Sequence, residues 1–378
     1  MKKISFCGLA FALFAATLSS LVACNNVEKK PEQSKLSIVT TIYPEYAWTK
    51  EILGSRADSV NLTLLMKNGV DLHSYKPTAQ DIAKIASADM VVSVGGESDE
   101  WIKKALEATP KKGRSEINLM EALGDRVKAE EVVEGMQAEH EEHHHGEHAD
   151  ASTSSATLEH HEHHDEHADP SASSGTKEHH EHHDEHAEEH HHHDHEEEVE
   201  NDEHVWLSLK NAEILVQKIT EELSNIDPAH ASLYNQNSTT YVAKIKALDG
   251  DYRTAVESAA RKTVLFGDRF PFRYLVDDYG IKYYAAFVGC SAESEASFET
   301  IAFLAGKMDS LSLPAIFTIE KGNQKIANAI LAASKKSKEA QILTLNSMQS
   351  VTEQQIIDGM DYLSIMKSNL DVLKNALK

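Results

Sequence analysis

The order of apolar and polar positions predicts a first series of alternating strands and helices. Short β-branched runs predict strands, and the segments between them carry apolar residues at helical spacing. The predicted strands are residues 35–42, 60–66 and 89–94, and the predicted helices are residues 45–53, residues 78–86 and a segment around Trp101. Thr78 is placed to cap the second helix. This alternation favours a parallel sheet with helices on both faces.

A long helical pattern separates this series from a second one. Asp227-Pro228 is typical of a helix start, and from there to residue 260 only Gly250 interrupts the pattern. A helix of roughly thirty residues would be about 50 Å long. Further predictions are a helix at 207–223, strands at 263–266, 282–287, 315–319 and 342–345, and helices at 272–278, 296–311, 323–333 and 352–377. We therefore expect an α/β fold of two lobes with mainly parallel sheets, joined by one long backbone helix, with a ligand cleft between them.

The amino terminus indicates export. Met1-Lys2-Lys3 precedes an apolar run through residue 21, which is typical of a signal peptide. Residues 21–24 read LVAC and resemble the lipobox of bacterial lipoproteins, in which Cys24 would be acylated after cleavage. An uncleaved amino-terminal anchor is the alternative. After loss of Cys7 and acylation of Cys24, Cys290 would remain alone, so no intramolecular disulfide is expected.

One segment dominates the composition. The chain contains 23 histidines, and all except His73, His204 and His230 lie between residues 140 and 195. The net charge of the chain is −24, and nearly all of it belongs to residues 139–203, so nothing suggests a basic nucleic-acid-binding surface. The tract has almost no apolar residues, so we expect a disordered metal collector; a solvated acidic spacer or a pH-sensitive segment are the alternatives. His230 is expected at the surface.

These features divide the chain into six parts. The predicted boundaries are a signal peptide at 1–23, a lipid tether at 24–34, an amino-terminal lobe at 35–138 and 201–226, a disordered insert at 139–200, a linking helix at 227–260 and a carboxyl-terminal lobe at 261–378.

Two motifs carry a resemblance to a known family. Residues 69–78 read GVDLHSYKPT, and residues 202–208 read DEHVWLS directly after the histidine-rich tract. They resemble the two amino-terminal metal-ligand motifs of the zinc and manganese solute-binding lipoproteins of metal ABC transporters. Residues 226–229 and the order of the later parts also match, so the resemblance covers nearly the whole mature chain.

The resemblance implies a metal site between the two lobes, with His73 and His204 as ligands from the amino-terminal one. The family usually has a histidine five residues before the tyrosine that matches Tyr274. This chain has Arg269 there, a permanent cation that cannot bind metal. Where the family often has Leu-Asp-Pro, residues 345–347 read LNS, and an amide oxygen is a poor zinc ligand.

Four residues remain as candidates for the other ligands. They are Asp268, Glu320, Glu295 and Cys290. Asp268 is the nearest substitute for the lost histidine, Glu320 ends a predicted strand, and Glu295 matches a Glu-Pro-Ser of the family. Cys290 would bind zinc well as a thiolate, although buried single cysteines also serve as inert packing.

The resulting hypothesis is an extracytoplasmic, monomeric, non-enzymatic lipoprotein, periplasmic or on the outer surface. It would bind Zn²⁺, in preference to Mn²⁺ or another divalent transition metal, and deliver it to an ABC permease with its ATPase. The lipid anchor would hold it to the membrane, and no nucleic-acid partner is expected. A metal-buffering or adhesin lipoprotein without transport is the alternative. A zinc hydrolase is a further alternative, but no hydrolase motif accompanies the two histidines.

Overall fold

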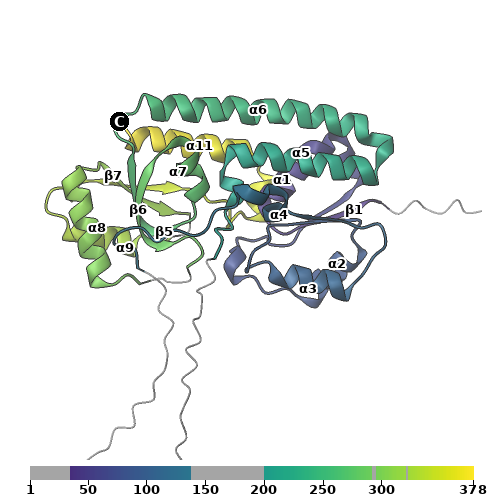
Figure 1. Cartoon of the computed structure of the whole chain (residues 1–378), viewed down its shortest axis with the longest axis horizontal. Helices are drawn as coiled ribbons and strands as arrows, with labels where there is room; N and C mark the ends of the chain where they lie inside the picture. Colours follow the sequence, from purple (N-terminus) through teal and green to yellow (C-terminus); the bar gives the residue numbers. More distant parts are fainter. Residues whose placement is uncertain (1–34, 138–199, 292–294, 321) are drawn as a thin grey trace, which may run out of the picture.

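The computed structural model describes residues 35–137, 200–291, 295–320 and 322–378 (Figure 1). The predicted signal peptide, Cys24 and almost the whole histidine-rich insert lie outside these residues. Within the described part, no helix combines the length and the apolar character needed to cross a membrane.

The first lobe contains four parallel strands in the order β2-β1-β3-β4. The strands are β1 (Ser37–Thr40), β2 (Asn61–Leu64), β3 (Met90–Ser93) and β4 (Ser115–Asn118), and the helices are α1 (Tyr43–Leu53), α2 (Ala79–Ser87), α3 (Glu100–Ala108) and α4 (Leu119–Leu123). Thr78 caps α2 as predicted, because its hydroxyl accepts a hydrogen bond from the Asp81 amide. The sequence pattern does not predict β4, an edge strand in which only Ile117 is buried.

The second lobe repeats this arrangement. Its four parallel strands have the order β6-β5-β7-β8, so strands at equivalent places in the two series occupy equivalent places in the two sheets. The strands are β5 (Thr263–Phe270), β6 (Lys282–Val288), β7 (Ala315–Ile319) and β8 (Gln341–Leu345), and the helices are α7 (Arg273–Tyr279), α8 (Phe298–Leu311), α9 (Lys325–Ala333), α10 (Glu353–Ile357) and α11 (Tyr362–Ala376). The prediction of two α/β lobes with parallel sheets is confirmed.

Two predicted boundaries in this lobe are wrong. Strand β5 continues beyond Phe266 to Phe270, with an irregular register between Phe266 and Arg269, so Asp268 belongs to the strand. The single helix expected at 352–377 is two helices. Gly359 adopts a φ of 89°, which ends α10, and the Asp361 carboxylate then caps α11.

The expected backbone helix is present as α6 (Ala231–Glu257), which follows a 3-10 turn at Pro228–His230. It runs along one side of the molecule and contacts α1 and α5 (Leu209–Ile226) of the first lobe and α7 and α11 of the second (Figure 1). This confirms the prediction of a long helix that spans both lobes.

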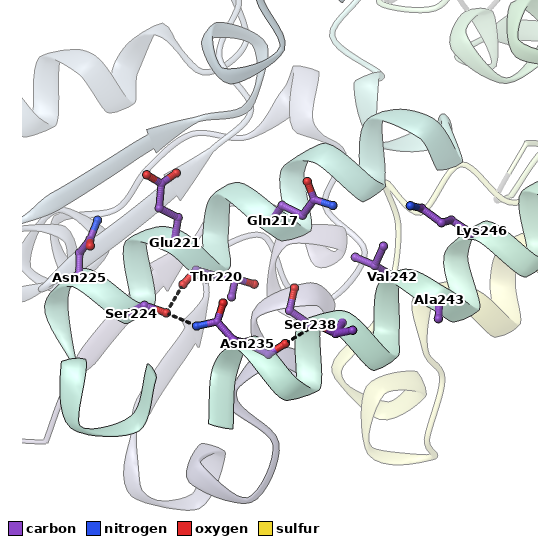
Figure 2. Close-up of a pocket in the computed structure, with 11 residues that line it drawn as sticks. Gln217, Thr220, Glu221, Ser224, Asn225, Asn235, Ser238, Val242, Ala243 and Lys246 are labelled. Atoms are coloured by element: carbon purple, nitrogen blue, oxygen red, sulfur yellow. Dashed lines mark hydrogen bonds between the residues drawn. The ribbon is translucent and has the colours of Figure 1, made fainter. Parts of the chain in front are cut away.

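A polar groove of about 650 Å³ lies between α5 and α6 (Figure 2). Its lining consists of amide, hydroxyl, charged and small apolar side chains, such as Gln217, Ser224, Asn235 and Lys246. No histidine or cysteine lines it, so this groove lacks the side chains of the predicted metal site.

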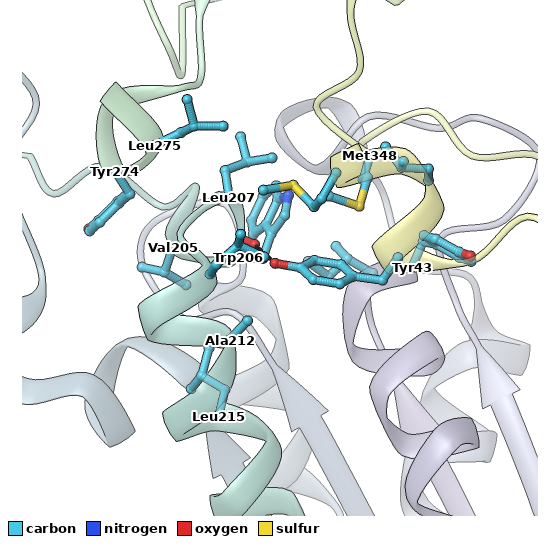
Figure 3. Close-up of a cluster of buried hydrophobic side chains, with 14 of the residues drawn as sticks. Tyr43, Val205, Trp206, Leu207, Ala212, Leu215, Tyr274, Leu275 and Met348 are labelled. Carbon is cyan, nitrogen blue, oxygen red and sulfur yellow. Dashed lines mark hydrogen bonds between the residues drawn. The ribbon is translucent and has the colours of Figure 1, made fainter. Parts of the chain in front are cut away.

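The two lobes share one continuous hydrophobic core. Trp206 is completely buried in it, in one cluster with Tyr43 of the first lobe and Met348 of the second (Figure 3). Its indole nitrogen donates a hydrogen bond to the Ser347 carbonyl (2.8 Å), and its own carbonyl accepts one from the Tyr362 hydroxyl (2.7 Å). Because Trp206 follows His204 by two residues, this core fixes the backbone from which His204 projects.

Two carboxyl groups are buried at the carboxyl end of β1. The Glu45 carboxylate accepts hydrogen bonds from the amides of Thr41 (2.7 Å) and Ile42 (3.2 Å). Asp99 Oδ2 accepts from the Val94 amide (2.7 Å), but Asp99 Oδ1 has no hydrogen-bond partner. Burial raises the pKa of Asp99 to about 7 and the pKa of Glu45 well above its ordinary value.

Asp99→Asn should therefore reduce the pH dependence of stability. An unfolded aspartate titrates near pH 4, so the folded state binds the extra proton between about pH 4 and pH 7, and stability falls as pH rises through this window. Between about pH 4 and pH 7, this carboxyl makes the free energy of unfolding of the parent chain decrease by up to roughly 4 kcal/mol, and Asp99→Asn should lack this decrease. Urea denaturation at pH 4.5 and 7 measures the difference. Glu107→Gln, an exposed change on α3, is the control, and equal slopes for Asp99→Asn and parent would contradict the assignment.

Candidate metal centre

Three side chains place metal-binding atoms close together. The donor atoms of His73, His204 and Cys290 all lie within 4.8 Å of one another, and the Nε2 atoms of the two histidines are 3.2 Å apart. Among the described residues, no other group of three such side chains comes this close. His73 follows β2, His204 follows the insert, and Cys290 follows β6 of the second lobe. The site therefore lies between the lobes.

Asp202 determines how His204 presents its ring. His204 is completely buried, and its Nδ1 lies 2.9 Å from Asp202 Oδ1, which also accepts a hydrogen bond from the His204 amide (2.8 Å). Since a carboxylate only accepts, Nδ1 carries the proton and Nε2 directs its lone pair into the site. Burial lowers the pKa of His204, but the Asp202 carboxylate outweighs it and the pKa is raised overall.

His73 is positioned by its own loop. Its backbone amide donates to Asp71 Oδ1 (3.0 Å), and its Nδ1 lies 2.8 Å from the Ser98 hydroxyl. Burial and the charge of His204 lower the pKa of His73 to about 3, so this ring is neutral at physiological pH. A neutral imidazole is the form that binds a metal.

The turn that carries Cys290 comes unusually close to His204. A Cβ added to Gly289 would lie 3.0 Å from His204 Cε1 and 2.9 Å from the Phe270 carbonyl oxygen, so glycine permits the approach. The Cys290 amide donates to Glu130 Oε1 (3.0 Å). Arg269 Nη1 donates to the Ser291 carbonyl (3.3 Å) on the other side. Burial, with the nearby carboxylates of Glu130 and Asp202, raises the pKa of the Cys290 thiol.

Glu130 is a residue of this site that sequence reasoning missed. Ala129 and Asn201 form an antiparallel bridge, which is closed by hydrogen bonds from the Glu130 amide to the Glu200 carbonyl and from the Asp202 amide to the Lys128 carbonyl, both 2.8 Å. A segment upstream of the insert and the segment that directly follows it therefore pair beside the metal-binding atoms. No sequence motif marks Glu130, because its place depends on this pairing across the insert.

Tyr274 joins this pair of segments to the second lobe. Its buried hydroxyl donates to the Asp202 carbonyl (2.8 Å) and accepts from the Lys128 amide (3.0 Å). Beyond Glu130 the chain contacts the second lobe, where the Gln137 amide donates to the Ala286 carbonyl (2.9 Å), although residues up to 138 were expected in the first lobe.

The other ligand candidates do not join the group. Asp268 and Glu320 line a neighbouring cleft of about 670 Å³ together with His73. Asp268 accepts hydrogen bonds from the Arg269 and Ile319 amides, and Glu320 accepts from the Ser347 amide and hydroxyl. Burial raises the pKa of both carboxyls. Glu295 is exposed on the surface.

Arg269 forms an ion pair instead of a metal contact. Its Nη2 lies 2.7 Å from Asp71 Oδ2, so it links the second lobe to the loop of His73. This guanidinium outweighs the effect of burial and lowers the pKa of Asp71. His230 is partly exposed and pairs with Asp227 at 2.9 Å. It does not belong to the donor group.

The donor set fits zinc. Two imidazole nitrogens and a sulfur atom match the nitrogen and sulfur preferences of Zn²⁺, which binds four ligands in a tetrahedron. Calcium and magnesium require more oxygen ligands than this group supplies. Neighbouring carboxylates, Asp202 and Glu203 among them, further favour a cation.

Comparisons with known proteins identify zinc-binding relatives. The family described as "Zinc-uptake complex component A periplasmic" (ZnuA) matches residues 38–376. The zinc-binding lipoprotein AdcA of Streptococcus pneumoniae is 32% identical over 99% of the chain, and the high-affinity zinc uptake system protein ZnuA of Bacillus subtilis is 28% identical over 97% of the chain and 96% of its own length. The crystal structure of the Zn(II)-bound ZnuA-like domain of S. pneumoniae AdcA covers 91% of the chain and 99% of that domain, with a TM-score of 0.61 and 26% identity.

The match to AdcA covers nearly all of this chain but only part of AdcA. The chain spans 61% of the length of that relative, whereas it matches almost the whole of the B. subtilis protein.

Gly289→Ala should weaken metal binding. The added methyl group would press on His204 and on the Phe270 carbonyl, so the turn must move and carry Cys290 away from the imidazoles. We expect the dissociation constant for Zn²⁺ to rise about tenfold or more, which corresponds to about 1.4 kcal/mol. Competition with a chelator measures it. Gly306→Ala in α8 is the matched control, because nothing lies within 4 Å of its Cβ position. Unchanged affinity in Gly289→Ala would show that the close approach is not needed.

Proposed function

Because the chain belongs to the zinc-uptake complex component A family, we propose that it binds Zn²⁺ outside the cytoplasm and delivers the ion to an ABC permease with its ATPase. The observation that carries this proposal is the convergence of the His73 and His204 Nε2 atoms at 3.2 Å between the two lobes. When both rings are neutral and carry their protons on Nδ1, each Nε2 can donate its lone pair to one cation bound at this point. Zinc is therefore cargo held between the lobes.

The first residues and the relatives support a location outside the cytoplasm. Residues 1–34 lie outside the described residues, but the signal-like run and the LVAC sequence support lipidation at Cys24. AdcA of S. pneumoniae is a lipoprotein by name, and the family description is periplasmic. We place the protein on the outer side of the membrane as a lipid-anchored monomer.

The histidine-rich insert would serve as a collector. Its carboxyl end leads into residues 200–202, which pair with residues 128–130 and directly precede His204, whereas its amino end follows Gln137, which pairs with β6 of the second lobe. Ions held loosely by its imidazoles would thus be concentrated next to the tight site, from which the permease receives them.

A receptor is favoured over the alternatives. The family is a component of an uptake complex and not a class of enzymes, which supports the expected non-enzymatic role against a zinc hydrolase. Metal buffering or adhesion without transport would use the same site. Deletion of the gene should then prevent growth in a medium with little zinc. Restoration of growth by the parent chain, but not by a variant that cannot bind zinc, would favour transport.

Replacing residues 139–199 by a Gly-Ser linker of about eight residues should leave the tight site intact, because the pairing of 128–130 with 200–202 does not depend on the insert. The number of Zn²⁺ ions bound per chain should fall to about one, with the dissociation constant of the tight site unchanged. Isothermal titration calorimetry measures both quantities. Loss of the tight site, in a variant that still unfolds cooperatively, would mean that the insert supplies its ligands.

His73→Ala and His204→Ala should each weaken the tight site severely. The remaining ligands are held by loops and by the core, so they cannot move to complete the coordination shell. We expect the dissociation constant to rise about a hundredfold or more, roughly 3 kcal/mol. His230→Ala, a histidine outside the donor group, should bind like the parent. Equal behaviour of all three variants in chelator competition would place the tight site elsewhere.

A further inference from the structure

We propose that Cys290 binds the metal as a thiolate, so that the site has two nitrogen ligands and one sulfur ligand and selects thiophilic ions such as Zn²⁺, Cd²⁺ and Co²⁺ over Mn²⁺. This inference rests on the proposed zinc-binding function and deepens it. It replaces the ligand that the second lobe was expected to supply from Asp268, Glu320 or Glu295.

Several contacts hold the turn of Cys290 close to His204. Gly289 lets the turn after β6 reach His204, and the neighbouring amide of Cys290 is held by the Glu130 carboxylate at 3.0 Å. The Cys290 thiol and the Glu130 carboxyl are also hydrogen-bonded to each other. The Arg269 guanidinium holds the next carbonyl of the turn, that of Ser291. A cysteine that only filled space would not need this close an approach to an imidazole.

The histidines independently point to a ligand at the same place. His204 is completely buried, and the partner of its Nε2 is the Nε2 of His73. The Nδ1 atoms of both rings are already engaged, by Asp202 and by Ser98. Glu203, which is 3% exposed, leaves Oε2 without a hydrogen-bond partner at 3.7 Å from His73 Nδ1. The Nε2 atoms of both rings are thus directed toward each other at the place where the Cys290 donor atom lies within 4.8 Å of both histidines.

Arg269 explains why the second lobe supplies sulfur. Its position on β5 is where the family resemblance implies a ligand, and here it is occupied by a cation that is paired with Asp71. Strands β6 and β7 both lie beside β5. The donor atom of Cys290, which follows β6, lies within 4.8 Å of both histidines, whereas Glu320, which follows β7, does not belong to that group.

Sulfur coordination changes which ions are retained. When the metal binds, the sulfur–hydrogen bond is replaced by a sulfur–metal bond, and the proton leaves to solvent. Thiolate is a soft ligand that suits Zn²⁺ and other thiophilic ions, whereas Mn²⁺ prefers oxygen ligands. A site with a carboxylate in place of Cys290 would discriminate less against Mn²⁺.

Cobalt provides a direct test of sulfur coordination. The chain from residue 25 onward contains Cys290 as its one cysteine, and Co²⁺ bound by a thiolate has a near-ultraviolet charge-transfer band that imidazole and carboxylate ligands do not give. One equivalent of Co²⁺ should produce this band in the parent chain, and Zn²⁺ should displace it. Cys290→Ser should abolish the band. A parent chain that binds Co²⁺ at the tight site without the band would overturn the proposal.

Affinities then test the selectivity. In Cys290→Ser the dissociation constant for Zn²⁺ should rise about a hundredfold, and the ratio of zinc to manganese affinity should fall about tenfold or more. Asp268→Asn and Glu320→Gln, which keep hydrogen-bond acceptors, should bind Zn²⁺ like the parent. If Cys290→Ser binds like the parent while Asp268→Asn or Glu320→Gln fails, the third ligand is a carboxylate and this inference is wrong, although zinc binding stands. If the parent itself lacks histidine-dependent zinc binding, the proposed function is wrong.

Discussion

The hydrogen bond between Asp202 and His204 is the interaction on which the metal centre depends. A buried imidazole could present either a proton or a lone pair to its neighbours, and the carboxylate at 2.9 Å from Nδ1 decides in favour of the lone pair at Nε2. Asp202 is itself held through its backbone, by Lys128 on one side and by the Tyr274 hydroxyl on the other. Contacts from the chain on both sides of the insert and from a helix of the second lobe thus fix the orientation of the His204 ring.

Much of the fold could be predicted from the sequence, because apolar periodicity reports which residues are buried. Strand β7 lies where the pattern places it, and the central strands β1 and β3 lie within the expected ranges. The prediction of helices and strands is wrong where few residues of an element are buried or where a single residue determines the end of an element. Strand β4 is a short edge strand with a mostly polar sequence. The break at Gly359 depends on a positive φ, which the surrounding helical pattern conceals.

The site could be predicted in part. His73 and His204 lie in recognisable motifs, and the structure brings them together. The contribution of the second lobe could not be read in the same way, because it depends on tertiary distances. Asp268 is adjacent to Arg269 in sequence, yet its carboxylate is engaged by backbone amides of its own lobe. Cys290 is far from any motif, and its nearness to His204 follows from Gly289 and from the register of β6 beside β5.

The shared core constrains how an ion can enter and leave. Trp206 ties the backbone near His204 to Ser347 and Tyr362 of the second lobe, and the apolar cluster around it is continuous through both lobes. Wide separation of the lobes would expose that cluster to water at a large cost in free energy. His73 and Cys290, by contrast, lie on loops at the edge of the core, and each is held by a few hydrogen bonds to single side chains. In the proposed site, small movements of these two loops would therefore loosen the ion while His204 stays in place, as expected of a site that must release its ion as well as bind it.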